Sequence, residues 1–143
     1  MKIEQLTLPP VTWGYIETLK NFISDSQLAT LAENTKGEEG QYFTEALRSM
    51  SDLVSSMPET YEQDGKGDQA VVYLHYFNSS MDWHITEKDS DPDGRGQIQA
   101  FGLANLGHGA ELGYISIQEL ILHDVEIDLH FTPKTLKEVK EAQ

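Results

Sequence analysis

The stretch AVVYLHYFNSSMDWHITEK, residues 70–88, decides the fold class of this chain. Residues 70–77 and 82–88 alternate apolar with polar side chains, which is typical of half-buried β-strands, and residues 78–81 are of the kinds found in tight turns. The stretch therefore predicts a β-hairpin. A four-residue loop places His75 opposite His84, and such cross-strand partners share one face of a sheet.

The alternation divides this hairpin into two faces. We expect one face in the core, formed by Val72, Leu74, Tyr76, Trp83 and Ile85. The other face gathers Tyr73, His75, Phe77, Asp82, His84 and Thr86. Two imidazoles and a carboxylate could bind a metal or form a pH-sensitive contact, so His75, His84 and Asp82 are candidate metal ligands. The commoner alternative is a polar sheet face whose histidines only form hydrogen bonds.

The chain after the hairpin predicts three more strands. Residues 97–104, 112–117 and 125–131 have strand character, and the last of these segments alternates apolar with polar side chains. Ser116 followed by Glu119 is a capping box that predicts a short helix before the fifth strand. Pro133 suits the first turn of a terminal helix.

The chain before the hairpin predicts helices. Residues 11–31 fit two short helices, with Ser24 as the N-cap of the second, and residues 41–57 carry an apolar stripe at helical spacing that ends at Pro58. We therefore predict an α+β fold in which N-terminal helices pack on a small, mainly antiparallel sheet of about five strands, with a short helix between the last two. The whole chain, 1–143, forms a single domain, with 1–60 as a helical extension of the 61–143 core.

Composition excludes several classes of function. The chain has no cysteine, which fits a reducing compartment and excludes thiolate nucleophiles and cysteine-ligated metals. It has no apolar run long enough for a membrane helix and no export signal, so we expect a cytoplasmic protein without membrane contact. No hydrolase, metalloprotease or phosphate-binding motif is present, which gives an enzyme or a cofactor no support.

The commoner interpretation of the chain's strong negative charge is solubility, and the alternative is an acidic face that competes with DNA for a basic groove. The 24 acidic and 10 basic residues give a net charge of −14, which argues against direct binding to nucleic acid and favours a basic protein surface as the partner. Negative potential should concentrate in the segment 59–93, which contains nine of these acids and, as basic residues, only Lys66 and Lys88. With Tyr73, these acids are the candidate partner-binding residues: Glu59, Glu62, Asp64, Asp68, Asp82, Glu87, Asp89, Asp91 and Asp93.

Residues 61–139 resemble a bacterial family of unknown function that is common on phages, plasmids and integrated elements. The most specific pieces are Asp82-Trp83 with Ile85-Thr86-Glu87, the block 110–114, and 128–131 followed by Pro133. The resemblance implies a mobile-element context and no catalytic residues. By analogy with small acidic proteins on such elements, it suggests a partner of host or phage origin and an antagonist of host defence that mimics DNA, of the anti-restriction or anti-CRISPR type.

Three functional hypotheses follow from the sequence. The leading one is a non-enzymatic acidic interaction protein that binds a basic partner. The second is a small metal-binding module or metal-dependent enzyme centred on His75, His84 and Asp82. The third is a homodimeric assembly protein that uses the helix at 41–57 as its interface.

Overall fold

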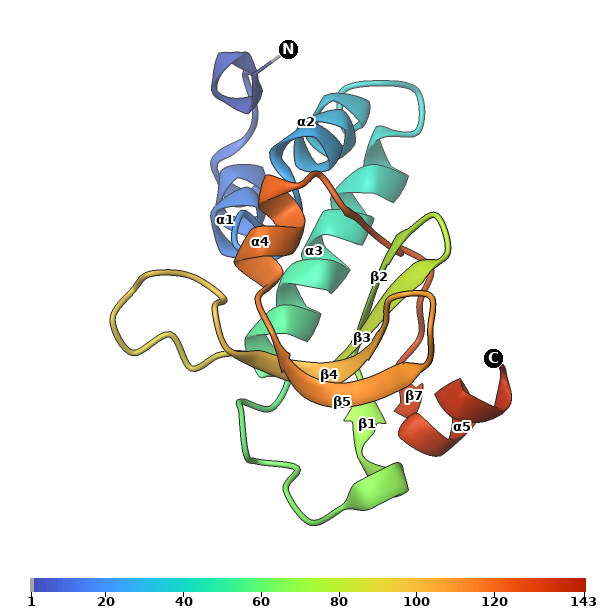
Figure 1. Ribbon diagram of the computed structural model, residues 1–143. Coiled ribbons are helices and arrows are strands. Elements are labelled where there is room, and N and C mark those ends of the chain that lie inside the picture. Colours follow the sequence, from blue (N-terminus) through green and yellow to red (C-terminus); the bar gives the residue numbers. More distant parts are fainter. Residues whose placement is uncertain (1) are drawn as a thin grey trace.

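The computed structural model describes residues 2–143 and has the predicted α+β fold (Figure 1). The helices are α1 (Pro10–Leu19), α2 (Asp25–Asn34), α3 (Gly40–Ser56), α4 (Ile117–Leu122) and α5 (Leu136–Glu141), with 3₁₀ turns at Ile3–Gln5 and Gly67–Gln69. The strands are β1 (Val71–Val72), β2 (Leu74–Asn78), β3 (Met81–Glu87), β4 (Ala100–Asn105), β5 (Ala110–Ile115), β6 (Glu126–Ile127) and β7 (Lys134–Thr135).

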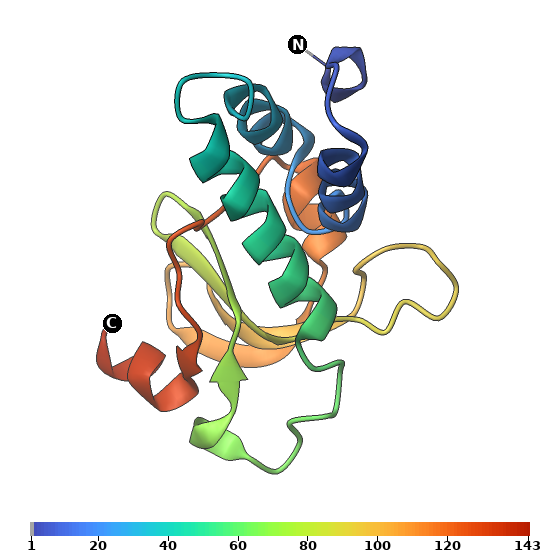
Figure 2. The ribbon, with the colours of Figure 1, turned by 180° about the vertical axis from the view of Figure 1, so that it is seen from behind.

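The N-terminal helices form one layer against the sheet. Helices α1 and α2 both pack on α3, which runs along one face of the sheet (Figure 2). Helix α1 begins at Pro10, whose missing N–H costs nothing at a helix start. Ser24 is the N-cap residue of α2, but its hydroxyl makes no capping hydrogen bond and is buried without a partner. The predicted pair of short helices is confirmed, although this cap contributes less than its residue type suggests.

The apolar stripe of α3 lies inside the molecule. Leu47 and Val54 are each 1% exposed, and both belong to the main hydrophobic core. Phe43, Met50 and Leu53 of the same stripe pack against this core and are only partly buried. The predicted helix is therefore confirmed, whereas a homodimer built on this helix stays a prediction.

The main sheet has five strands in the order β5-β4-β3-β2-β6, and every neighbouring pair is antiparallel. The hairpin β2–β3 has the predicted register, with His75 opposite His84. Its loop is shorter than predicted, because Asn78 and Met81 also pair and leave a two-residue turn. Ser79 adopts a positive φ of 52° in this turn, as tight hairpin turns require.

The predicted first strand is broken at Tyr73, which separates β1 from β2. Val72 consequently belongs to a second apolar cluster, with Leu103 and Leu136, while Tyr73 packs against the main core. The assignment of these two residues to faces was therefore wrong. The reason is that strict alternation holds only while a strand stays continuous, and β1 leaves the main sheet to pair with β7.

The C-terminal elements also differ from the prediction. Strand β6 ends at Ile127, because the Asp128 carboxylate accepts a hydrogen bond from the His130 N–H and turns the chain away from the sheet. Pro133 precedes β7 instead of opening a helix. Helix α5 begins after Thr135, whose side chain forms a capping box with Glu138.

The core joins both halves of the chain. The main cluster contains Leu19 and Leu47 from the helices together with Leu74 and Ile85 from the sheet. We call this helix-covered side the first face of the sheet. The second face carries the smaller cluster beneath α5. Among residues 2–143 there is no helix long and apolar enough to cross a membrane.

Candidate functional site

The two hairpin histidines lie together on the second face. Their rings stack with centroids 4.4 Å apart and planes within 6°. The Nε2 atom of His75 lies 2.5 Å from Asp82 Oδ1, and its Nδ1 atom lies 3.2 Å from Asp128 Oδ2. Phe131 packs against both imidazoles, 5.8 Å from one ring and 5.9 Å from the other. The sequence predicted three of the four polar members of this cluster, and the turn after β6 supplies Asp128.

The electrostatics of this cluster differ between the two rings. Burial, and then the neighbouring His75, lower the pKa of His84 from 6.5 to about 4, so that His84 is neutral at physiological pH. Burial opposes ionisation of Asp128, but hydrogen bonds from the His130 N–H and from His75 outweigh it and lower the Asp128 pKa. The carboxylates on either side of His75 hold that ring in place.

The histidine cluster does not have the arrangement of a metal site. Parallel stacked rings cannot direct their nitrogen lone pairs at one ion, and both nitrogens of His75 already face carboxylates. Within residues 2–143, no three His, Asp or Glu side chains are grouped so that they could hold a metal ion. The contacts of Asp128 and Phe131 with the two histidines attach the segment 128–131 to the hairpin.

The acidic candidates do not form one surface. Glu87 is only 5% exposed, so it is not part of any external acidic patch. Asp68 pairs with Lys140, and the Glu62 carboxylate accepts from the Glu59 N–H. Asp82 lies on strand β3, and the remaining acids lie on two loops, the 57–69 loop and the 88–99 loop, which extend in different directions (Figure 1).

Asp89 organises the 88–99 loop from within. Its carboxylate accepts hydrogen bonds from the N–H groups of Asp91, Ile98 and Gln99, at 2.9, 3.2 and 3.0 Å. Burial raises the pKa of Asp89, but these backbone donors outweigh that effect and lower the pKa below its usual value. This carboxylate therefore serves the loop's own structure, whereas Asp93 at the tip is exposed.

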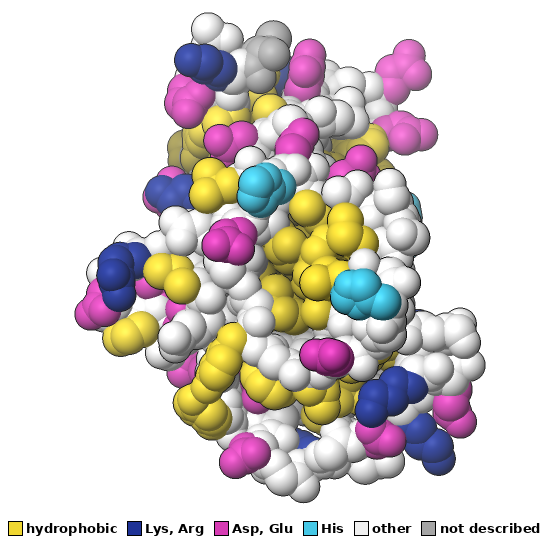
Figure 3. All heavy atoms as spheres, in the orientation of Figure 1, with side chains coloured by type: hydrophobic (Ala, Val, Ile, Leu, Met, Phe, Trp, Pro, Cys, Tyr) yellow, Lys and Arg dark blue, Asp and Glu magenta, His cyan; other side chains and the backbone are white. Residues whose placement is uncertain are grey.

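An open apolar groove on the first face is the feature that sequence reasoning missed. The groove, of about 650 Å³, lies beside helix α4, and we call it the α4 groove. Figure 3 shows apolar side chains gathered in this hollow, between α4 and the β4–β5 hairpin. Its lining residues are Asn78, Met81, Trp83, Ala104, Leu106, Tyr114, Ile115, Ser116, Glu119, Leu120, His123 and Val125.

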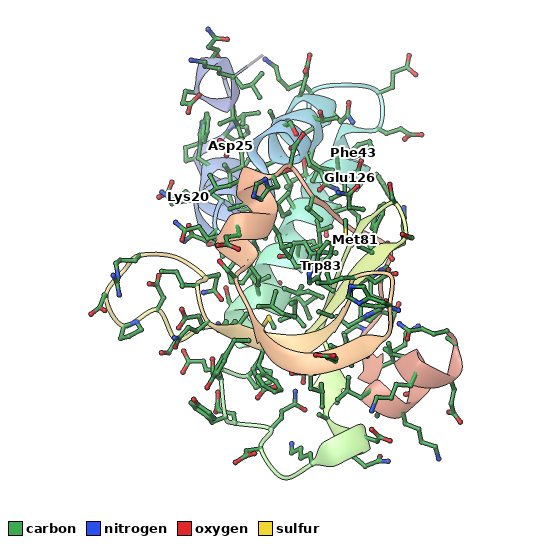
Figure 4. All side chains as sticks on the ribbon, viewed as in Figure 1. Lys20, Asp25, Phe43, Met81, Trp83 and Glu126 are labelled. Carbon is green, nitrogen blue, oxygen red and sulfur yellow. The ribbon has the colours of Figure 1, made fainter. Side chains whose placement is uncertain are left out.

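The α4 groove follows from the register of the sheet. Trp83 pairs with Ala104, which places a large ring beside a small side chain on the floor (Figure 4). Ser116 caps α4 by accepting from the Glu119 N–H at 3.2 Å, and this fixes the helix along one wall. The one signal of this site in the sequence is Leu106, an apolar residue within a glycine-rich turn. In the structure this leucine is 49% exposed.

The rim of the α4 groove is acidic. Glu119 lines it directly, and Glu111 points to the same face because it pairs with Ala104 on the groove floor. None of the lining residues is a lysine or an arginine. The groove therefore combines an apolar floor with a negative border, which is the complement of a basic amphipathic segment.

The fold and this groove define an acidic α+β protein with an open apolar groove beside helix α4. No family model, curated protein or solved structure matches the chain. The family resemblance of residues 61–139 therefore stays a prediction.

Proposed function

We propose that this chain is a non-enzymatic interaction protein that binds a basic, amphipathic segment of a partner protein in the α4 groove. The observation that carries the proposal is an open groove with an apolar floor, acids on its rim and no cation among its lining residues. An amphipathic helix that lays its apolar side chains into such a groove is a common mode of peptide recognition.

The net charge of −14 supports a basic partner in a second way. A strongly negative protein attracts a positive segment over long distances, which speeds association and makes it sensitive to salt. Apolar contacts with Trp83 and Leu106 would then supply affinity at short range. In the bacterial mobile-element context that the resemblance suggests, the partner is a basic protein of host or phage origin.

Groove docking has more support than mimicry of DNA. A DNA mimic presents carboxylates in a regular external array, yet Glu87 is buried and Asp89 is engaged with its own loop. Asp82 likewise contacts His75. These three acids are therefore not free to take part in such an array, whereas the groove needs only its apolar floor and the acids of its rim.

Selection from a random peptide library, with the purified chain as bait, tests the proposal. We expect selected peptides to carry apolar residues at helical spacing together with lysines or arginines, and to bind more weakly as salt concentration rises. Leu106→Asp should weaken binding of a selected peptide by about tenfold or more, measured by fluorescence anisotropy.

Leu122→Asp is the matched control. Leu122 is 76% exposed and does not line the groove, so the same substitution there should leave the affinity unchanged. Peptides that are acidic, or that bind the wild type and Leu106→Asp equally well, would show that the α4 groove is not the binding surface.

A further inference from the structure

A separate cavity opens on the second face of the sheet. It has a volume of about 440 Å³, within the range of small-molecule sites, and we call it the Glu87 pocket. The 60–70 loop covers it on one side, and β3, β4, β5 and the start of α5 supply the other walls. It is lined by Thr60, Tyr61, Gln63, Asp64, Gly65, Gly67, Ala70, Thr86, Glu87, Phe101, Leu112 and Leu136.

An irregularity in strand β3 places a carboxylate in this pocket. The register against β4 shifts between Ile85 and Glu87, so that Glu87 pairs with Phe101. Thr86 and Glu87 consequently both line the pocket, although consecutive strand residues normally point to opposite faces. Strict alternation would have placed Glu87 on the helix-covered side.

The Glu87 carboxylate is buried without a cation. The side chain is 5% exposed, and the Thr86 hydroxyl donates a hydrogen bond to it. None of the ion pairs formed by residues 2–143 includes Glu87. Burial of a carboxylate is costly unless a charge or several donors compensate it, so the protein alone leaves this group under-compensated.

The other walls leave Glu87 as the polar centre. Phe101, Leu112 and Leu136 are apolar, and the Gln63 amide is hydrogen-bonded to Val71 and Thr86. That amide holds the covering loop against β1 and β3. The second acid of the lining, Asp64, is exposed, and the lining contains no lysine or arginine. An anionic ligand would therefore meet only negative charge.

We propose that the Glu87 pocket binds an organic cation, namely a protonated amine or guanidinium on an apolar stem. The cationic group pairs with the Glu87 carboxylate, and the stem packs against Phe101 and Leu112. This site lies on the sheet face opposite the α4 groove, so it goes beyond the proposed function and stands or falls independently of it. The cation can come from a free small molecule or from a lysine side chain of a partner.

Binding of phenethylamine, with phenethyl alcohol as its neutral analogue and hydrocinnamate as its anionic analogue, tests this inference. Chemical-shift changes in the folded protein give both the affinity and the position of each compound. We expect phenethylamine to bind about tenfold or more tightly than the alcohol, with shifts at Phe101 and Leu112, because the charged hydrogen bond to Glu87 adds to the same apolar contacts. A blocked tripeptide with one central lysine tests the side-chain source in the same way.

Glu87→Gln keeps the shape of the side chain and removes its charge, so it should abolish the preference for the amine. Asp64→Asn makes the same change at the exposed rim and should largely preserve that preference. If Glu87→Gln does not fold, a second variant, Leu112→Trp, replaces it. Leu112 is a wall residue that is 49% exposed, and the larger tryptophan ring should fill the pocket and block binding. Any one of three results would overturn the proposal. The first is equal affinity for the amine and the alcohol, and the second is that neither cationic probe binds. The third is that phenethylamine binds the Glu87→Gln and Leu112→Trp variants as tightly as it binds the wild type.

Discussion

The buried imidazole of His84 should make the protein's stability depend on pH in a defined window. His84 is 7% exposed, and its Nδ1 atom is buried without a hydrogen-bond partner. In the unfolded chain this imidazole binds a proton near its ordinary pKa of 6.5, whereas in the folded protein it does so only at about 4. The unfolded state therefore binds more protons between these values, and the free energy of unfolding falls as pH falls.

The magnitude follows from the two pKa values. One pKa unit corresponds to about 1.4 kcal/mol, so the difference between 6.5 and about 4 amounts to about 3 kcal/mol. This contribution is complete above the unfolded pKa and is lost progressively as the pH decreases to the folded pKa. Asp89 and Asp128 have lowered pKa values in the folded protein, so the free energy of unfolding falls further when these carboxylates become protonated at low pH.

His84→Phe isolates the imidazole, because phenylalanine keeps an aromatic ring beside His75 and cannot bind a proton. Urea unfolding at a series of pH values from about 7 to about 4 should show that the variant loses up to about 3 kcal/mol less than the wild type. His108→Phe, at an exposed position, should follow the wild-type curve. Parallel curves for the wild type and His84→Phe would refute the reasoning, since they would mean that His84 titrates alike in both states.

Two further predictions concern the backbone and use paired substitutions. Gly102→Ala should destabilise the fold by about 2–4 kcal/mol in urea unfolding, because an added Cβ would lie 2.0 Å from the His84 carbonyl oxygen. Gly113→Ala, at its cross-strand partner with open space around it, should be close to neutral, and equal effects of the two substitutions would show that the close contact with the His84 carbonyl is not what restricts position 102. Asp89→Ala should cost about 1–3 kcal/mol and speed proteolysis within 88–99, because three backbone N–H groups lose their acceptor. Asp93→Ala at the exposed tip should change neither the free energy of unfolding nor the rate of proteolysis. If the 88–99 loop resists protease in both variants, the Asp89 carboxylate does not stabilise that loop.

The sequence by itself determined the secondary structure class and the central hairpin. Period-two alternation placed His75 opposite His84, and the helical stripe ending at Pro58 gave α3 nearly to its ends. These features depend on residues close together in the chain, where spacing and turn chemistry carry the information. The net charge is likewise a property of composition and follows directly from the sequence.

Only the tertiary structure decided where the groove and the pocket lie. The α4 groove combines residues from β3, β5 and α4, and the Glu87 pocket depends on a register irregularity that reverses the expected direction of one side chain. The clustered acids of 59–93 were dispersed for the same kind of reason, because they are divided between two loops and strand β3, where Glu87 is buried. Local periodicity fixes which residues form a strand, but contacts between distant strands fix which faces stay open.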